Sequence, residues 1–113
     1  MDKVYNIKWT SPAKDDLDEI IGYISKTNLA YAVKTMDKIY EQVKKLDMFP
    51  ERCRIVPELE KCGYLIYREL NVEYWKVIFK IENDIVYLMM VIDGRRNLED
   101  ILLKKILFRE NEI

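Results

Sequence analysis

The sequence predicts an α+β fold in which a four-stranded, mainly antiparallel sheet packs against a hairpin of two helices. Three observations lead to this prediction. Two successive segments have the apolar spacing of helices, three later segments resemble strands, and only short turn-like breaks separate the members of each group. The expected order is β-α-α-β-β-β-α over residues 1–113, a length that suits a single domain. Half of the residues are apolar and 35% are charged, which is ordinary for a globular protein.

The first two elements are expected to be a strand followed closely by a helix. Residues 4–9 alternate in the manner of a strand with one buried face. Ser11 is expected to cap the helix, with Pro12 at the first helical position, where proline needs no hydrogen bond. The helix then continues to about residue 26 along one apolar stripe, formed by Ala13, Leu17, Ile20, Ile21 and Ile24.

A second helix is expected over about residues 29–48, only two or three residues after the first. Its apolar side is predicted to consist of Leu29, Val33, Met36, Ile39 or Tyr40, Val43 and Leu46. Two helices joined so closely form an antiparallel hairpin. Phe49 and Pro50 are expected to end it, because proline cannot continue a helix, and residues 53–63 are expected to be an irregular link.

Three strands and a last helix are expected in the second half of the chain. The strands cover residues 64–70, 74–82 and 85–93, and the helix runs from Asn97, its cap, to about Phe108. The apolar residues of this helix are Leu98, Ile101, Leu102, Leu103, Ile106, Leu107 and Phe108. They surround so much of it that it needs cover on more than one side, from its own domain or from another chain.

The expected strand pairing separates an apolar face of the sheet from a cationic face. A two-residue loop at residues 83–84 would pair Lys80 with Tyr87 and Lys76 with Val91, and a loop at residues 71–73 would place Arg68 across from Lys76. The apolar face collects Trp75, Val77, Phe79, Ile81, Val86, Leu88, Met90 and Ile92 and should be covered by the helical hairpin. The cationic face should stay open, and because like charges that face each other destabilise a sheet, we expect an anion to bind there.

Arginine is confined to the second half of the chain. The six arginines are Arg52, Arg54, Arg68, Arg95, Arg96 and Arg109. A guanidinium group suits phosphate and carboxylate recognition better than an ammonium group does, so any anion-binding surface is expected in this half. The net charge of −1 argues against general nucleic-acid binding, which usually accompanies a basic protein.

Several other classes of protein are not indicated. Cys53 and Cys62 lack CxxC spacing, which favours free thiols in a reducing cytoplasm. The longest apolar stretch, residues 85–92, is far shorter than the ~20 residues of a membrane-spanning helix, so no membrane association is expected. The sequence has no glycine-rich phosphate loop and no cluster of metal ligands, so neither a cofactor nor a metal is expected.

Five segments together resemble the RelE/ParE superfamily of bacterial type II toxins. They read WTSPAKDDLDEIIGYI, FPERCRIVPEL, GYLIYREL, YWKVIFKI and VIDGRRNLEDIL, and the resemblance extends from about Ile7 to Leu103. It implies a cytoplasmic toxin that is neutralised by a small co-expressed antitoxin wrapped around it. It also implies one of two targets, since some members cut mRNA on the ribosome and others inhibit DNA gyrase.

The resemblance also suggests candidate site residues. Lys76 stands where nucleolytic members usually have arginine, and Arg95 and Arg96 match basic residues after the last strand. With Arg68 these are the candidate catalytic residues, while Lys80 and Tyr87 are candidates for binding nucleic acid or another target.

Two departures from the superfamily pattern leave the activity open. Asp93 stands where histidine is common, and residues 101–103 lack the tyrosine that RelE-like nucleases use. These departures favour a gyrase-directed toxin, whereas the cations favour a ribosome-dependent mRNA interferase. An inactive binding module is a third interpretation.

Overall fold

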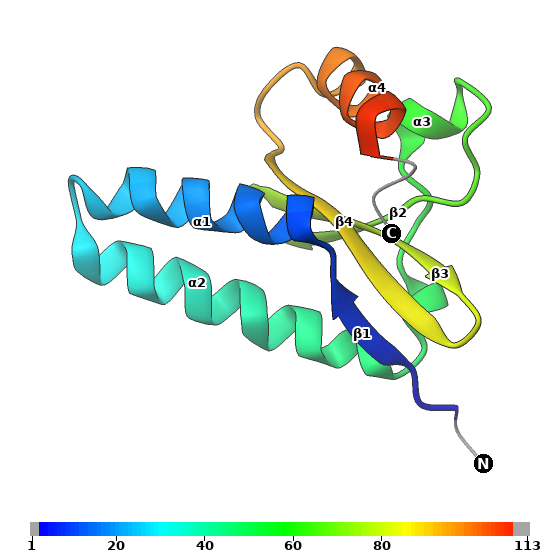
Figure 1. Ribbon diagram of the computed structural model, residues 1–113, viewed down its shortest axis with the longest axis horizontal. Helices are drawn as coiled ribbons and strands as arrows, with labels where there is room; N and C mark the ends of the chain where they lie inside the picture. The colour runs from blue at the N-terminus through cyan, green and yellow to red at the C-terminus, as the bar shows by residue number, and fades with distance from the viewer. Residues whose placement is uncertain (1–2, 110–113) are drawn as a thin grey trace.

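The computed structural model describes residues 3–109, and its elements follow the predicted order (Figure 1). The elements are β1 (Asn6–Trp9), α1 (Ser11–Ser25), α2 (Leu29–Lys44), α3 (Pro57–Glu60), β2 (Arg68–Val72), β3 (Trp75–Glu82), β4 (Ile85–Asp93) and α4 (Leu98–Arg109), with 3-10 turns at Lys45–Asp47 and Pro50–Arg52. The short helix α3 lies within the link predicted to be irregular, because proline can occupy the first turn of a helix. In the described part of the chain, every helix is too short or too polar to cross a membrane.

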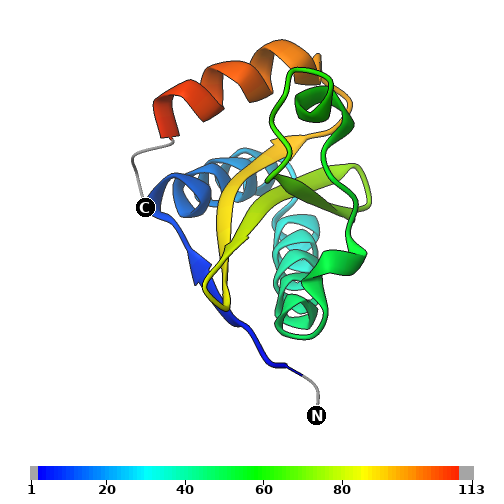
Figure 2. The same cartoon turned by 90° about the vertical axis from the view of Figure 1, so that its right-hand side faces the viewer.

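The four strands form one sheet in the order β1-β4-β3-β2. β1 runs parallel to β4, whereas β3 is antiparallel to both β2 and β4. The helices α1 and α2 pack on one face of this sheet, and α3 and α4 pack on the other (Figure 2). The predicted α+β fold with a mainly antiparallel sheet is therefore confirmed.

Both helices of the hairpin begin at a side-chain cap. The hydroxyl of Thr10, rather than that of Ser11, accepts the N–H of Ala13 at 3.4 Å and donates to the carbonyl of Leu88 at 2.6 Å. Asn28 caps α2 by accepting the N–H of Tyr31 at 2.9 Å. The prediction of Ser11 as the cap is wrong by one residue, because Thr10 can bond to β4 and to α1 at once.

The first hydrophobic core lies between the hairpin and the sheet, and we call it the hairpin core. It contains Tyr5, Ala13, Leu17, Ile39, Val43, Leu46, Leu70, Val72, Trp75, Val77, Phe79, Val86, Leu88 and Val91. Most of the residues predicted to form the apolar face of the sheet lie here. Burial of these large side chains is the main favourable term for the fold.

The buried side of α2 differs from the predicted apolar stripe. Leu29, Val33 and Tyr40 are 68%, 46% and 41% exposed, whereas Ala32 and Thr35 are buried. The buried side of α2 is thus rotated about the helix axis relative to the predicted stripe. The sequence pattern does not show this rotation because alanine and threonine contribute little to a hydrophobic stripe, although their small size allows close packing.

A bulge in β4 changes the predicted face of several residues. Asn83 and Asp84 form the predicted two-residue turn with φ of 49° and 67°, and Lys80 pairs with Tyr87 as expected. Beyond Phe79 the pairing shifts by one residue. Four residues change face or partner as a result: Val91 packs in the hairpin core, Met90 and Ile92 turn to the other face, and Lys76 pairs with Ile92 rather than Val91.

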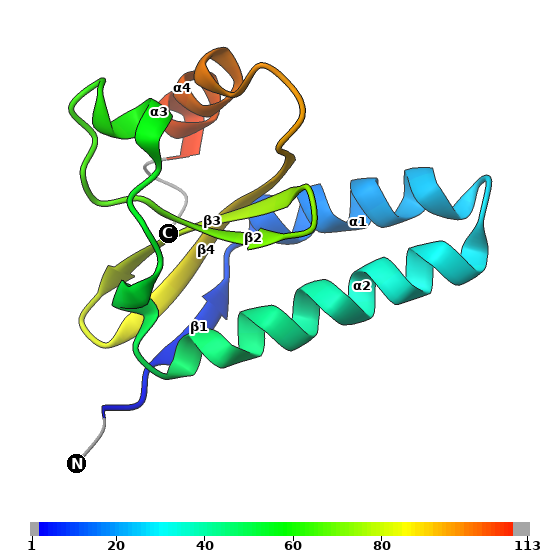
Figure 3. The same cartoon turned by 180° about the vertical axis from the view of Figure 1, so that it is seen from behind.

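The turn between β2 and β3 is shorter than predicted (Figure 3). The loop consists of residues 73–74, and Glu73 adopts φ of 55°. Asn71 therefore pairs with Lys76, and Arg68 pairs with Phe79. The predicted side-by-side placement of Arg68 and Lys76 is wrong, because the longer strand moves them to opposite faces of the sheet.

The second face of the sheet is covered rather than open. A second core, here called the α4 core, contains Val56, Leu59, Tyr67, Ile78, Met89, Met90, Ile92, Leu98, Leu102 and Ile106. The apolar side chains of α4 are therefore covered by residues of the same chain. The prediction of an open cationic face is wrong. The side chain of Phe108, which the sequence assigns to this helix, lies outside the described residues.

A buried carboxylate attaches α4 to the rest of the fold. Asp16 in α1 binds Lys105 at 3.2 Å and Arg109 at 2.7 and 2.9 Å, and it accepts the N–H of Val91 at 3.1 Å. Arg109 also donates to the carbonyl of Met89, at the bulge, at 3.2 Å. These bonds join α1, β4 and α4 at one point.

Candidate target-binding cleft

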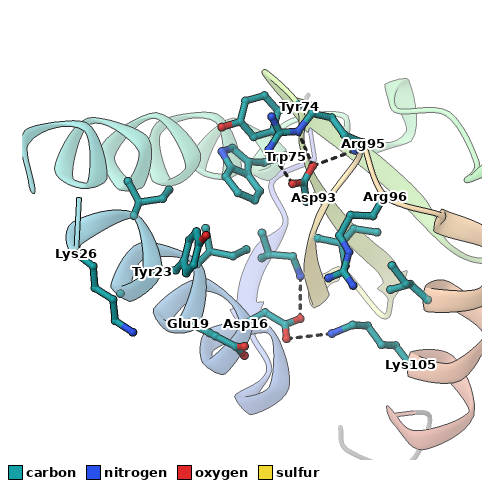
Figure 4. A pocket seen from close by; sticks show the side chains of 16 residues that line it. Asp16, Glu19, Tyr23, Lys26, Tyr74, Trp75, Asp93, Arg95, Arg96 and Lys105 are labelled. Carbon is teal, nitrogen blue, oxygen red and sulfur yellow. Dashed lines mark hydrogen bonds and ion pairs between the residues drawn. The ribbon is translucent and has the colours of Figure 1, made fainter. Parts of the chain in front are cut away.

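A cleft of about 670 Å³ lies between α1 and the segment that connects β4 to α4 (Figure 4). Its floor is apolar and consists of Ile20, Ile24, Trp75, Val91, Ile92 and Ile101. Charged and aromatic side chains line its rim. In Figure 4 Glu19 and Tyr23 come from α1 and Lys26 from its C-terminal cap, while Arg96 and Lys105 come from the opposite side.

Arg95 is held firmly at this rim. Its Nε donates to Asp93 Oδ1 at 3.0 Å and its second guanidinium nitrogen to Oδ2 at 2.8 Å, while the guanidinium lies 3.7 Å from the centre of the Tyr74 ring. The hydrogen bond from Arg95 lowers the pKa of Asp93, which keeps that carboxylate charged. Tyr74 in turn meets the hydroxyl of Tyr31 at 3.3 Å.

Arg96 differs from its neighbour because its guanidinium is free. Its backbone N–H donates to the carbonyl of Asp93 at 3.2 Å, but within the described residues its exposed side chain forms no hydrogen bond or ion pair. Arg96 is therefore available to an anionic partner.

Gly94 brings the two arginines to the cleft. Its N–H donates to the carbonyl of Tyr74 at 2.7 Å, and an added Cβ would lie 2.7 Å from that oxygen and 3.2 Å from Lys76 Cε. Only glycine allows the chain to pass so close to the β2–β3 turn. This contact places Arg95 over the Tyr74 ring and Arg96 at the rim.

Two of the predicted cations instead hold neighbouring segments. Arg68 donates to the carbonyls of Cys53 at 2.5 Å and Glu51 at 3.2 Å. Lys76 donates to Glu69 and to Asn71, both at 2.9 Å. The side chain of Lys76 passes beside Gly94, but neither Arg68 nor Lys76 lines the cleft.

Lys80 and Tyr87 lie away from the cleft as well. Lys80 is only 6% exposed and pairs with Glu82 at 3.2 Å, while the half-buried Tyr87 packs against the α4 core. Of the six predicted site residues, only Arg95 and Arg96 line the cleft. The functional roles assigned to all six stay predictions.

The sequence interpretation did not predict that Asp16 and Glu69 are buried and bound by cations. Asp16 occupies a position within the apolar stripe of α1, between Ala13 and Leu17, and an acid at such a position indicates a buried ion pair. Glu69 alternates with apolar residues on β2 and gives no comparable signal.

Glu69 is charged although its side chain is fully buried. It accepts hydrogen bonds from Lys76 and Arg54 at 2.9 Å and from Asn71 at 3.3 Å. Burial alone would raise the pKa of Glu69, but the hydrogen bonds from these three residues together lower it below its ordinary value.

Comparison with known proteins identifies the family of this chain. The family model described as "ParE toxin of type II toxin-antitoxin system, parDE" matches residues 7–98, which is most of the sequence. The chain belongs to the ParE toxin family. This agrees with the RelE/ParE resemblance that the sequence motifs predict.

A solved structure has the same fold as this ParE-family chain. A chain from the "Chromosomal ParDE TA system from P. aeruginosa" superimposes with a TM-score of 0.62 at 23% identity, covering 78% of this chain and 94% of that one. Comparison with curated protein sequences gave no significant match. The ParE match ends at residue 98, where α4 begins, so the helix that supplies Ile101 and Lys105 to the cleft lies beyond the matched region.

Four groups of this ParE-family chain have pKa values that are shifted away from neutrality. Burial raises the pKa of the Cys53 thiol, and the hydrogen bond with Tyr31 raises the pKa of Tyr74, while Asp93 and Glu69 have lowered pKa values. Each shift moves the group further from neutrality, where a general acid or base works best. Within residues 3–109, no group of three or more potential ligands is placed to hold a metal ion.

Proposed function

We propose that this chain is a type II toxin that arrests growth by binding DNA gyrase, without cutting nucleic acid. Membership of the ParE toxin family supports the toxin role and implies an antitoxin partner. The superfamily resemblance allows two activities, inhibition of gyrase and cleavage of mRNA on the ribosome. The choice between them rests on the chemistry of the candidate residues.

The observation that carries this proposal is that most candidate cations already have partners. RNA cleavage by the 2′-hydroxyl needs a general base, a general acid and cations that stabilise the charge on phosphorus. Lys76 is bound to Glu69, and Lys80 is bound to Glu82. Arg95 is bound to Asp93. To bind these cations, a phosphate group of RNA would have to displace the carboxylates that are paired with them.

The placement of acids and bases also favours a non-cleaving toxin. Glu69 is the carboxylate that pairs with Lys76, but its lowered pKa makes it a weak base and its burial separates it from a substrate. Residues 101–103, where the nucleases have a tyrosine, have packing roles here. Leu102 is fully buried in the α4 core, and Ile101 and Leu103 pack against that core.

The proposal predicts inhibition of gyrase by the purified protein without ribosomes. Supercoiling of relaxed plasmid by gyrase should stall as the protein is added, while relaxation by topoisomerase I, the matched control, should continue. An unchanged gyrase topoisomer pattern at saturating protein would overturn the proposal.

A second measurement addresses the alternative activity. In a translating bacterial extract, transcripts should remain intact at a protein concentration that stops supercoiling. Discrete cuts within translated mRNA would instead favour ribosome-dependent cleavage. Normal growth of bacteria that express the folded chain alone would contradict both activities and favour an inactive binding module.

A further inference from the structure

Apolar side chains form an exposed stripe along α2. Leu29, Val33 and Tyr40 are 68%, 46% and 41% exposed, and the half-buried Met36 lies between them. Their spacing of four, three and four residues is that of the apolar positions in a coiled coil, which places all four on one side of the helix. Single exposed apolar residues are common, but a contiguous apolar surface usually marks a site of interaction. We call these four residues the α2 stripe.

The hairpin core covers a different side of α2. The buried residues of this helix are Ala32, Thr35, Ile39 and Val43. The α2 stripe runs beside them, and the ring of Tyr40 rests against the ring of Trp9 in β1, with the ring centres 5.4 Å apart. Because α2 lies at the outer edge of the molecule, a second helix can reach the stripe (Figures 1 and 3).

Two unpaired charges of opposite sign accompany the α2 stripe. Asp37 and Lys44 are exposed, and among the residues that the structure describes neither side chain forms an ion pair or a hydrogen bond. Side chains that pair on one helix lie three or four residues apart, whereas these two are seven apart, so they do not pair with each other. Both charges are therefore available to another chain.

The order of these charges makes α2 complementary to an antiparallel copy of itself. With a twofold axis at Tyr40, Asp37 and Lys44 lie at nearly equal distances on either side of the axis. Asp37 of each copy then faces Lys44 of the other, and symmetry makes two such ion pairs. A parallel pair of helices would instead bring like charges to the same level of the interface. Charge complementarity thus favours a second copy of the chain as the occupant.

We propose that the chain forms a symmetric dimer in which two α2 stripes pack antiparallel. The Tyr40 rings meet at the centre, and Asp37 pairs with the partner's Lys44. Val33 approaches the end of the partner's α2, where Met48 is 42% exposed. In the described part of the chain α2 lines no part of the cleft, so both clefts of the dimer stay open. Dimer formation by the free chain does not depend on which target the toxin has.

Sedimentation velocity over a series of protein concentrations measures the association. The unmodified chain should pass from monomer to dimer as its concentration rises. Tyr40→Glu places two acids at the centre of the interface and should leave only monomers over the same series. An unmodified chain that stays monomeric throughout would leave the α2 stripe to a different protein and overturn the proposal.

Charge reversal distinguishes this dimer from other arrangements. Asp37→Lys and Lys44→Asp each turn two attractions into two repulsions, so each variant alone should dimerise at least about tenfold more weakly. An equimolar mixture of the two variants should regain the dimer, because opposite charges face each other again in the mixed pair. Asp15→Lys makes the same change on an exposed part of α1 and should alter the affinity by less than about twofold. Equal affinity of both reversed variants, or a mixture that stays monomeric, would contradict the antiparallel pairing.

Cross-linking of the unmodified chain tests the contact without any substitution. A carbodiimide joins a carboxylate to an amine through an amide bond only when the two groups touch. In an equal mixture of isotope-labelled and unlabelled chains, mass spectrometry should find Asp37 linked to Lys44 between one labelled and one unlabelled peptide. Links between chains that are confined to other pairs of residues would place the interface elsewhere and reject the α2 stripe.

Discussion

Asp16 and Glu69 are both buried acids that bind two cations, but they connect very different parts of the chain. Asp16 binds Lys105 and Arg109, about ninety residues away in sequence, as well as the backbone of β4. Glu69 binds Lys76 and Arg54, which are 7 and 15 residues away. The first cluster attaches a helix to the fold, whereas the second joins adjacent segments around β2.

The difference shows that similar ion pairs can have different structural consequences. The sheet and its turns already hold the partners of Glu69 close together, so their ion pairs are supported by hydrogen-bonded neighbours. The partners of Asp16 lie on α4, which contacts the rest of the fold through the α4 core, this cluster and an exposed ion pair between Lys61 and Glu99. Loss of Asp16 should therefore affect α4 and the cleft wall together. Substitutions of Asp16, of Glu69 and of their cationic partners test the two sides of this comparison.

Removal of the Asp16 carboxylate should have the largest effect. Asp16→Ala leaves two cations and one backbone N–H without their acceptor, and we expect a loss of about 3 to 5 kcal/mol in the free energy of unfolding. Asp16→Asn keeps an oxygen for the Val91 N–H and should lose less. Urea denaturation measures both.

The neighbouring Asp15 provides the control for this change. It lies on the same helix but is exposed, so Asp15→Ala should change stability by no more than about 0.5 kcal/mol. Equal stability of the Asp16→Ala variant and the unmodified chain would mean that the α4 core holds the helix without the ion pairs.

Neutralisation of Glu69 should reduce stability somewhat less and should change its pH dependence. Glu69→Gln leaves Lys76 without a charged partner, at a cost of about 1.5 to 3 kcal/mol at neutral pH. The pKa of Glu69 is lower in the folded chain than in the unfolded chain, so the unfolded state binds the proton first as pH falls. The stabilisation is complete above about pH 5 and is lost progressively as pH falls towards the folded pKa.

Unfolding measured between pH 7 and pH 3 should show this difference as a flatter curve for Glu69→Gln. Glu51 and Asp93 also have lowered pKa values, so some acid sensitivity will remain. The exposed Glu60→Gln is the control and should leave the slope unchanged. A slope unaffected by Glu69→Gln would contradict the assigned charge state.

The sequence predicts local features of this fold better than features that depend on register. The turn at Asn83 and Asp84 is correct because both residues tolerate the positive φ that a two-residue hairpin needs. The bulge at Met89 is not predicted, because Ile85 to Ile92 is a continuous apolar run and alternation cannot show which residue is extra. One inserted residue then changes the face of those beyond it.

The candidate site is only partly predictable for the same reason. Arg95 and Arg96 are neighbours in sequence and reach the cleft together, whereas the expected contact of Arg68 with Lys76 depends on the length of the β2–β3 loop. The cleft itself forms between segments far apart in sequence. Only the acid at position 16, within an apolar stripe, gives a local indication of it.

The two cations bound to Asp16 should contribute unequally. Arg109 forms bonds to both carboxylate oxygens and to the carbonyl of Met89, so Arg109→Ala should cost about 1.5 to 3 kcal/mol. Lys105 forms one bond at 3.2 Å and is more exposed, so Lys105→Ala should cost less than about 1 kcal/mol. Urea denaturation would compare them with Leu107→Ala, at an exposed position on the same helix. A larger loss for Lys105→Ala would contradict the assigned geometry.

The smallest effect is expected at Arg54. Its side chain is 66% exposed, and Glu69 keeps its bonds to Lys76 and Asn71 when this arginine is removed. Because solvent screens an exposed cation, Arg54→Ala should reduce the free energy of unfolding by less than about 1 kcal/mol. Denaturation at low and high salt should give nearly the same difference between the variant and the unmodified chain. A loss as large as that of Glu69→Gln would show that Glu69 needs both cations, and the contrast with the Asp16 cluster would then disappear.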